Sequence, residues 1–164
     1  MEEKLSSLKQ SGDDPGAERP DDTGRTLCET DFDSIISNTF ALPEHDWSQY
    51  SPLTLAWLGD TVFDLLVRTQ IVKNANMSPD RLHRKATAVV NARNQARIAE
   101  EISQLLTEEE AAVMRRGRNS SPGHSAKNAE RREYLEATGL EALIGYLYLK
   151  KRYGRITELL RNAL

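Results

Sequence analysis

The sequence predicts an all-α domain, and three observations support that prediction. Apolar residues recur at spacings of three and four, as in Leu55, Leu58 and Val62, which is typical of a helix with one buried face. Two Ser-Pro pairs, at 51–52 and 78–79, place a capping serine before a proline, and proline is common at the first position of a helix. No segment alternates apolar and polar residues as a half-buried strand does.

The first 30 residues differ in composition from the rest of the chain. Residues 1–33 carry ten acidic and four basic side chains, a net charge of −6, so residues 34–164 carry a net charge of +3. The stretch SGDDPGAERPDDTGRT is acidic, rich in turn-forming residues and too poor in apolar residues to bury a core. We therefore expect a disordered acidic tail over 1–30 and one folded domain over 31–164.

The first half of the domain is expected to form four successive helices. A short amphipathic helix is predicted near 31–40. The first Ser-Pro pair begins a helix that runs to about Val72, and the second begins a basic helix that runs through Val90. Asn91 is expected to cap the fourth helix, NARNQARIAEEISQLL.

The second half is expected to form three more helices around one loop. Thr107 with Glu110 three residues later matches a capping box, which predicts a short helix. The Gly/Ser/Pro-containing stretch 117–128 has no helical or strand period and is expected to be a loop. A long helix is predicted over about 129–151, followed by a break at 153–154 and a last helix, ITELLRNAL.

Composition argues against several classes of protein. The single cysteine, Cys28, cannot form a disulfide within the chain, and no Cys/His cluster has the spacing of a zinc site. No run of about 18 apolar residues is present to span a membrane. The N-terminus MEEKLSSLKQ lacks the basic and apolar segments of a secretory signal. We expect a cytoplasmic protein with no membrane partner.

Two of the predicted helices carry a carboxylate beside their apolar stripe. Asp60 lies in LAWLGDTVFD, and Glu141 lies in TGLEALIGYLYL. Gly59 costs about 1 kcal/mol of helix stability relative to alanine, which indicates close approach of another element. Each acid could be a surface residue at the edge of its stripe, or the two could converge and hold Mg²⁺, which binds a few carboxylate oxygens and retains several waters. The spacing leaves both interpretations open.

These two motifs resemble those of the ribonuclease III family. LAWLGDTVFDLLVR is similar to the family's signature helix and LEALIGYLYL to its late catalytic helix, in the same order and at a similar separation. SPDRLHRKATAVVNARNQA, TEEEAAVMRRGRN and the lack of a C-terminal double-stranded-RNA-binding domain resemble the Mini-III branch. The resemblance covers roughly residues 35–164.

The resemblance implies a homodimeric, Mg²⁺-dependent endonuclease that cleaves double-stranded RNA and leaves 5′-phosphate products. It makes Asp60 and Glu141 the catalytic metal ligands, and it implies action on a 23S ribosomal RNA precursor with a ribosomal protein as a stimulating partner. Two further carboxylates of the family are replaced here by Ala56 and Thr138, which leaves the number of metal ions open. Asp64 is either a solvated residue or an acceptor for a metal-bound water.

Two other classes of function compete with this enzyme. A non-catalytic RNA-binding or ribosome-associated protein could retain the ribonuclease III fold, and the two replaced carboxylates favour that alternative. Retention of both Asp60 and Glu141 argues against it. A helical protein-interaction module would not need the basic, glycine-containing loop at 117–128.

Basic side chains of the domain itself are the expected RNA contacts, because no separate RNA-binding domain follows. A-form RNA is recognised mostly through its shape, phosphates and 2′-hydroxyls. Charged helix faces can also be merely solvated, so the assignment is a hypothesis. The residues concerned are Arg81, Arg84, Lys85, Arg93, Arg97, Arg115, Arg116, Arg118 and Lys127, together with the neighbouring Arg131 and Arg132.

Trp57 has two interpretations. It could be an ordinary core residue of its helix. The resemblance implies instead an aromatic at the dimer interface that inserts into an apolar pocket of the partner subunit, a role that suits aromatic anchors. We expect the second interpretation to hold.

Overall fold

The structure, a computed structural model, describes residues 32–43, 45–120 and 128–164. Contacts within the chain divide it into two units, 1–43 and 44–164, and each is described by itself. The expected acidic tail, 1–30, lies outside the described residues, and so does Lys127. In the first unit the described residues contain one helix, α1 (Phe32–Thr39), with no buried side chain.

In the second unit the described residues form helices joined by turns and short loops, which confirms the all-α prediction. Within the described ranges no strand occurs. None of the described helices is both long and apolar enough to cross a membrane. The elements in chain order are η1 (Trp47–Gln49), α2 (Pro52–Asn74), α3 (Pro79–Val89), α4 (Ala92–Ile102), η2 (Ser103–Leu105), α5 (Glu108–Arg118), α6 (Asn128–Leu149) and α7 (Tyr153–Leu160).

The helix starts follow from local capping chemistry. The Ser51 side chain accepts a hydrogen bond from a backbone N–H of the first turn of α2, and Asn91 does the same for α4. Thr107 and Glu110 form both hydrogen bonds of the predicted capping box at α5. Ser78 precedes α3 but makes no side-chain capping hydrogen bond. Pro79, at the first helical position, is therefore the local feature that favours the start of α3.

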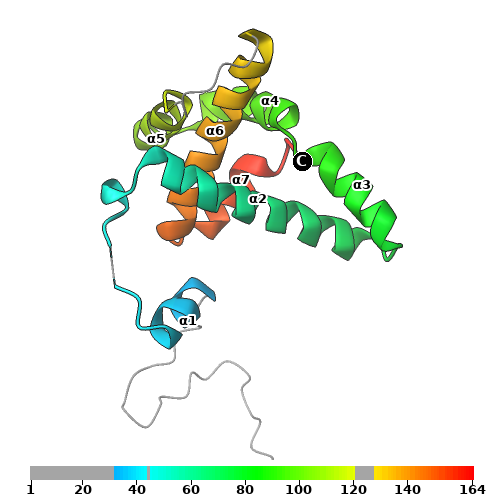
Figure 1. The fold of residues 1–164 in the computed structure, drawn as a ribbon, viewed down its shortest axis with the longest axis horizontal. Helices are drawn as coiled ribbons and strands as arrows, with labels where there is room; N and C mark the ends of the chain where they lie inside the picture. Colours follow the sequence, from blue (N-terminus) through cyan, green and yellow to red (C-terminus); the bar gives the residue numbers. More distant parts are fainter. Residues whose placement is uncertain (1–31, 44, 121–127) are drawn as a thin grey trace, which may run out of the picture. The chain divides into compact units, whose positions relative to one another are not determined.

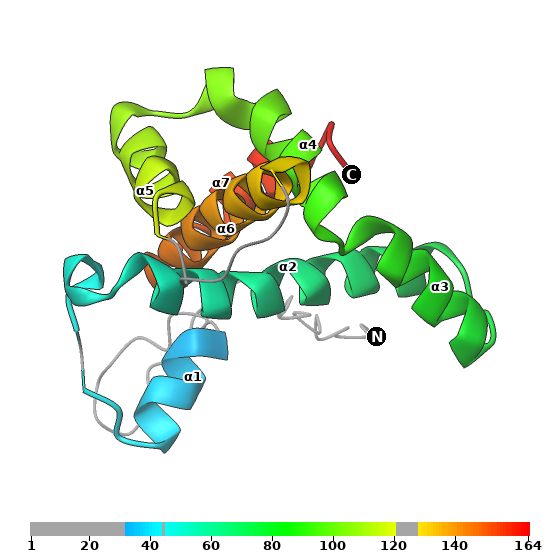
Figure 2. The same ribbon diagram turned by 45° about the horizontal axis from the view of Figure 1, so that its top comes forward.

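Helix α6 is the centre of the second unit. It contacts α2, α4, α5 and α7, and Figures 1 and 2 show α2 crossing it. Leu143 and Leu147 of α6, Phe63 and Val67 of α2, and Ile98 of α4 are all buried in one apolar cluster. This burial fixes α2 and α6, the two helices that carry the predicted metal ligands, against each other.

The predicted loop at 117–128 begins too early. Helix α5 continues through Gly117 to Arg118, and Gly117 is buried against α6. A Cβ atom at Gly117 would lie 2.6 Å from the Cβ of Ala142, so this glycine permits close helix packing rather than ending a helix. Residues 121–127 of the predicted loop are outside the described residues.

The predicted break at 153–154 is also wrong, because α7 begins at Tyr153. Helix α6 ends at Leu149, and the chain turns through Lys151, whose φ of 55° is in the left-handed region. A non-glycine residue rarely adopts this conformation, and nothing in the local sequence marks Lys151 for it.

Candidate active site

Helices α2 and α6 touch backbone to backbone at two glycines. A Cβ atom at Gly59 would lie 1.8 Å from the carbonyl oxygen of Glu141, and one at Gly145 would lie 2.1 Å from the carbonyl oxygen of Leu55. Any side chain at either position would collide with backbone atoms, which cannot rotate away. The close approach predicted from Gly59 is confirmed, and its partner is α6.

This crossing brings the two predicted metal ligands together. Asp60 follows Gly59 and is exposed, whereas Glu141 lies one turn before Gly145 and is half-buried. Burial raises the pKa of Glu141 to about 7, and the nearby charge of Asp60 contributes to the increase. The two carboxylates are thus close enough to repel each other, and a cation between them would relieve that repulsion.

Gln95 on α4 is a third member of the site that the sequence did not reveal. Its side chain is buried and donates a hydrogen bond to Glu141, which lowers the pKa of that carboxyl and partly opposes the effect of burial. The available signal was a lone polar residue on the apolar face formed by Ala96, Ala99 and Ile102. A polar residue on an apolar face does not by itself show that Gln95 contacts Glu141.

Beside Asp60 lies a polar cavity of about 250 Å³ between α2 and α3. Its polar lining comes from Asp60, Thr61, Asp64, Arg68 and Thr87. Asp64 Oδ2 accepts a hydrogen bond from Arg68 Nε at 2.7 Å. Asp64 Oδ1 is buried, and no donor among the described residues reaches it. An orphaned carboxylate oxygen next to Asp60 fits a site that takes a hydrated cation.

The two replaced family positions supply no further carboxylate. Ala56 and Thr138 are both buried, and the Thr138 hydroxyl donates to the Tyr134 carbonyl oxygen at 2.9 Å. In the described part of the chain no group of three or more acidic, histidine or cysteine side chains converges on a metal-sized site. A cation held by two carboxylates would complete its coordination with water and phosphate oxygens, which Mg²⁺ accepts.

Comparison with known proteins identifies the family to which this fold belongs. The family model described as "Ribonuclease III domain" matches residues 53–152, which include both acids and the helix crossing. The chain belongs to the ribonuclease III family.

The relatives in this family place the chain within one branch. A Mini-ribonuclease 3 of Clostridium tetani is 41% identical over 119 residues, which cover 72% of this chain and 79% of the relative. A Mini-ribonuclease 3 of Symbiobacterium thermophilum is 44% identical over 129 residues, which cover 78% of this chain and 92% of the relative. The crystal structure of a Fusobacterium nucleatum protein aligns with a TM-score of 0.65 and 32% identity, covering 73% of this chain and 95% of that one. The resemblance to the Mini-III branch is confirmed.

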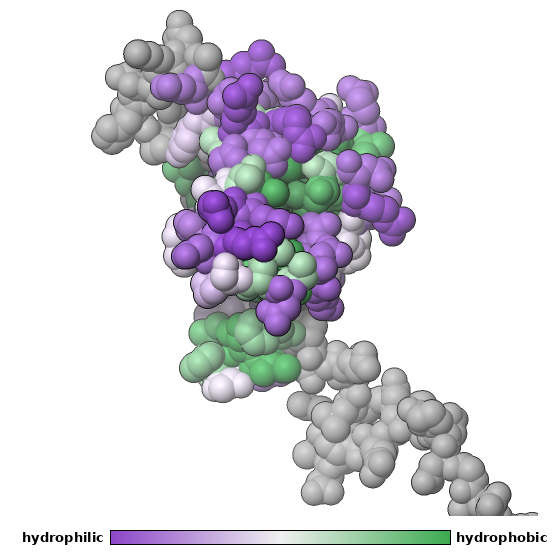
Figure 3. Space-filling view, turned by 90° about the vertical axis from the view of Figure 1, so that its right-hand side faces the viewer, coloured by the Kyte–Doolittle hydropathy of each residue, from purple (hydrophilic) through white to green (hydrophobic). Residues whose placement is uncertain are grey.

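The basic side chains of this ribonuclease III domain fall into two groups. One group is exposed and has no bonded partner among the described residues. These are Arg81, Arg84 and Lys85 of α3, Arg93 of α4 and Arg115 and Arg116 of α5. Figure 3 views the molecule from the side where α3 lies in Figure 1, and hydrophilic side chains dominate that face.

The second group is engaged in contacts within the protein. Arg97 donates to the Ala163 carbonyl oxygen at 2.9 Å and pairs with Glu101, so it ties the C-terminal residues to α4. Arg118 lies 3.4 Å from Glu136, and Arg132 lies 2.6 Å from Glu100. The donors of these side chains are partly occupied, which makes the first group the better source of phosphate contacts.

Trp57 lies outside the core of the ribonuclease III domain. Its side chain is 78% exposed, and Leu53 and Leu65 on the same helix are also exposed. A separate apolar groove of about 600 Å³ runs between α2, α6 and α7, lined by Leu65, Tyr148 and Tyr153 among others. The core interpretation of Trp57 is therefore excluded within one chain, and its place at a dimer interface stays a prediction.

Proposed function

We propose that this chain is an endoribonuclease that cleaves double-stranded RNA. The observation that carries the proposal is the convergence of Asp60 and Glu141 where α2 and α6 cross at Gly59 and Gly145. A non-catalytic RNA-binding protein would have no need to hold two repelling carboxylates together, since their charges oppose binding of phosphate. Membership in the ribonuclease III family supports the same activity.

Asp60 and Glu141 would hold one divalent cation, for which we propose Mg²⁺. When bound, the cation neutralises charge on the scissile phosphate and activates water for attack, which gives 5′-phosphate products. Glu141 must lose its proton to act as a ligand, and its pKa of about 7 makes this deprotonation pH-dependent. The buried Gln95 amide fixes the orientation of the Glu141 carboxylate through its hydrogen bond.

The exposed cations on α3, α4 and α5 would contact the RNA backbone. Arg81, Arg84 and Lys85 lie on α3, which lines one wall of the polar cavity at Asp60. Phosphate contacts of this kind recognise the A-form duplex by shape rather than by sequence. As the natural substrate we propose a 23S ribosomal RNA precursor in the bacterial cytoplasm, with a ribosomal protein as the stimulating partner.

A homodimer is the proposed working assembly. Two strands of opposite polarity are cut most simply by two sites related by a two-fold axis. The exposed Trp57 supplies a projecting aromatic side chain, and the apolar groove beside Leu65 supplies a depression that could receive such a side chain from a partner subunit. Analytical ultracentrifugation of the wild type and of Trp57→Ala would test this assembly, and we expect the variant to sediment as a monomer.

The test of the activity is incubation of the purified full chain with long double-stranded RNA, with and without Mg²⁺. We expect cleavage only with Mg²⁺, and more than about 100-fold slower cleavage by Asp60→Asn and Glu141→Gln, because loss of outer-shell residues alone costs 10–100-fold. Glu108→Gln, a change at an exposed carboxylate on α5, is the matched control and should cleave normally. Duplex binding without cleavage by the wild type would favour the non-catalytic alternative.

A further inference from the structure

The two oxygens of the Asp64 carboxylate lie in different environments. Oδ2 accepts a hydrogen bond from Arg68 Nε at 2.7 Å, one helical turn further along α2. Oδ1 is buried, and no donor in the described part of the chain reaches it. Buried acceptors in folded proteins are nearly always hydrogen-bonded, so Oδ1 indicates a donor other than the described residues.

The described side chains around Oδ1 do not supply this donor. Ala86 and Val90 line the cavity with apolar side chains, and the Thr87 hydroxyl already donates to the His83 carbonyl oxygen at 2.9 Å. The hydroxyl of Thr61 also lines the cavity but makes no hydrogen bond to Oδ1. Arg68 is engaged with Oδ2 through its Nε. We therefore infer that a small polar molecule in the cavity donates the hydrogen bond to Oδ1.

The cavity has both the size and the polarity to hold water next to Asp60. Its volume of about 250 Å³ exceeds several times the roughly 30 Å³ that one water occupies in the liquid. Asp60 and Asp64 are four residues apart on one helix and therefore lie on the same face, about one turn or 5–6 Å apart. This spacing places the Asp64 carboxylate where one water can bridge it to a cation held by Asp60.

We propose that Asp64 is a positioning residue for the cation site, and this proposal rests on the proposed function above. Oδ1 accepts a hydrogen bond from a water in the coordination shell of the cation that Asp60 holds. Oδ2 keeps the carboxylate in that orientation through Arg68. Residues that orient a coordination shell in this way tune affinity for the metal without touching it.

The competing explanation is that Asp64 acts only through its negative charge or by holding Arg68. Replacing both members of the pair separates these explanations, because Asp64→Ala/Arg68→Gln has the same net charge as the wild type and removes the acceptor Oδ1. The single variant Arg68→Gln leaves Oδ1 in place, and the more negative site offsets the loss of the contact that orients Asp64. A purely electrostatic role thus predicts normal Mg²⁺ affinity for the double variant.

The experiment is calorimetric titration of Mg²⁺ alone, without RNA, into the full-length protein and its variants, with circular dichroism as a check on folding. We expect the double variant to bind Mg²⁺ about 10-fold or more weakly than the wild type, and Arg68→Gln to bind within about threefold of it. Asp60→Asn should show no binding. Wild-type affinity in the double variant, or an equal loss in Arg68→Gln, overturns the role of Asp64.

The Asp60→Asn variant separates the two levels of the proposal. If it loses Mg²⁺ while the double variant binds normally, the cation site stands and only the role of Asp64 is overturned. If Asp60→Asn itself binds Mg²⁺ as tightly as the wild type, the cation site proposed above is overturned, and the role of Asp64 with it.

Discussion

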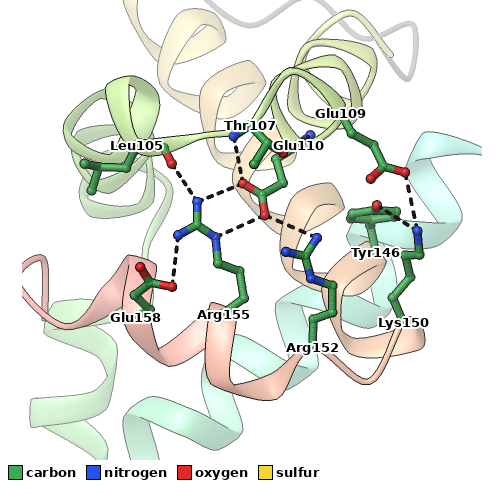
Figure 4. Close-up of polar contacts among 9 residues, drawn as sticks. All are labelled: Leu105, Thr107, Glu109, Glu110, Tyr146, Lys150, Arg152, Arg155 and Glu158. Atoms are coloured by element: carbon green, nitrogen blue, oxygen red, sulfur yellow. Dashed lines mark hydrogen bonds and ion pairs between the residues drawn. The ribbon is translucent and has the colours of Figure 1, made fainter.

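Two glutamates in this domain, Glu110 and Glu141, have opposite surroundings. Glu110 on α5 is 0% exposed, yet it accepts hydrogen bonds from Arg155 at 3.0 and 3.1 Å and from the Thr107 backbone at 2.9 Å (Figure 4). Arg152 adds an ion pair at 3.6 Å. Burial would raise the pKa of Glu110, but the hydrogen bonds from Arg155 and Thr107 outweigh it, so the pKa is lowered.

Glu141 has one neutral donor, Gln95, and a like charge, Asp60, as its neighbours. Burial therefore raises its pKa to about 7, and the charge of Asp60 adds to the effect. The comparison teaches that burial alone does not distinguish a structural carboxylate from a functional one. Glu110 is compensated by Arg152 and Arg155, whereas no cationic side chain among the described residues lowers the pKa of Glu141, which suits the metal ligand proposed above.

The largest expected effect comes from breaking the contact that creates the environment of Glu141. Gly59→Ala places a Cβ atom 1.8 Å from the Glu141 carbonyl oxygen, so α2 and α6 must separate. We expect a loss of about 5 kcal/mol or more in the free energy of unfolding, since overpacking against backbone is among the few mechanisms that reach this size. Urea denaturation measures it.

Gly154→Ala is the matched control for that variant. Nothing lies within 4 Å of the added Cβ, and Gly154 is in the first turn of α7. This change should stabilise the protein by about 0.5–1 kcal/mol, because alanine restricts the unfolded chain. Equal stability of the two variants would contradict the backbone contact between α2 and α6.

The next largest effect is expected at Glu110. Glu110→Ala leaves Arg152 and Arg155 without their shared buried partner, so we expect a loss of about 3–5 kcal/mol by thermal or urea denaturation. Glu158→Ala removes an exposed partner of Arg155 and should cost less than about 1 kcal/mol. If the two changes cost the same, Glu110 is not the structural carboxylate described above.

The smallest effect has the opposite sign and depends on pH. In the folded state the pKa of Glu141 is about 7, above its ordinary value of 4.5, so the folded protein holds this proton more tightly than the unfolded chain. The wild type should lose stability as pH rises from about 4.5 through 7, and Glu141→Gln should not. Without divalent cations, we expect the variant to be more stable by about 1–3 kcal/mol at pH 8 and by much less at pH 5.

Thermal denaturation in a chelating buffer at both pH values measures this difference. Adding Mg²⁺ at pH 8 should stabilise the wild type and leave Glu141→Gln nearly unchanged, because only the wild type has both ligands. A pH-independent difference between the two proteins would show that Glu141 is charged in the folded state throughout this range.

The helix starts could be predicted from the sequence because capping is local. Ser51, Asn91 and Thr107 each bond to a backbone N–H within three residues, so the signal and its consequence lie in one short window. The end of α5 could not be predicted in this way. Gly117 looks like a loop residue until α6, which follows it in the chain, is packed against it.

The same distinction holds for the site. The sequence can suggest Asp60 and Glu141 as site residues because each lies in a motif that resembles a known family and next to a glycine or an apolar stripe. Gln95 was not found, since its role depends on α4 packing against α6. The Arg155 partner of Glu110 was missed for the same reason, as it lies 45 residues along the chain.

The crossing of α2 and α6 also determines when the site exists during folding. Its two acids are far apart in the sequence, and the helices that carry them also bury much of the core. Closing so long a segment of chain is entropically unfavourable until the core forms, so the site should assemble late, together with the whole domain. Local fraying cannot separate Asp60 from Glu141, and amide exchange around Gly59 and Gly145 should require global unfolding. Enzymatic activity in this protein is therefore a direct reporter of the folded fraction.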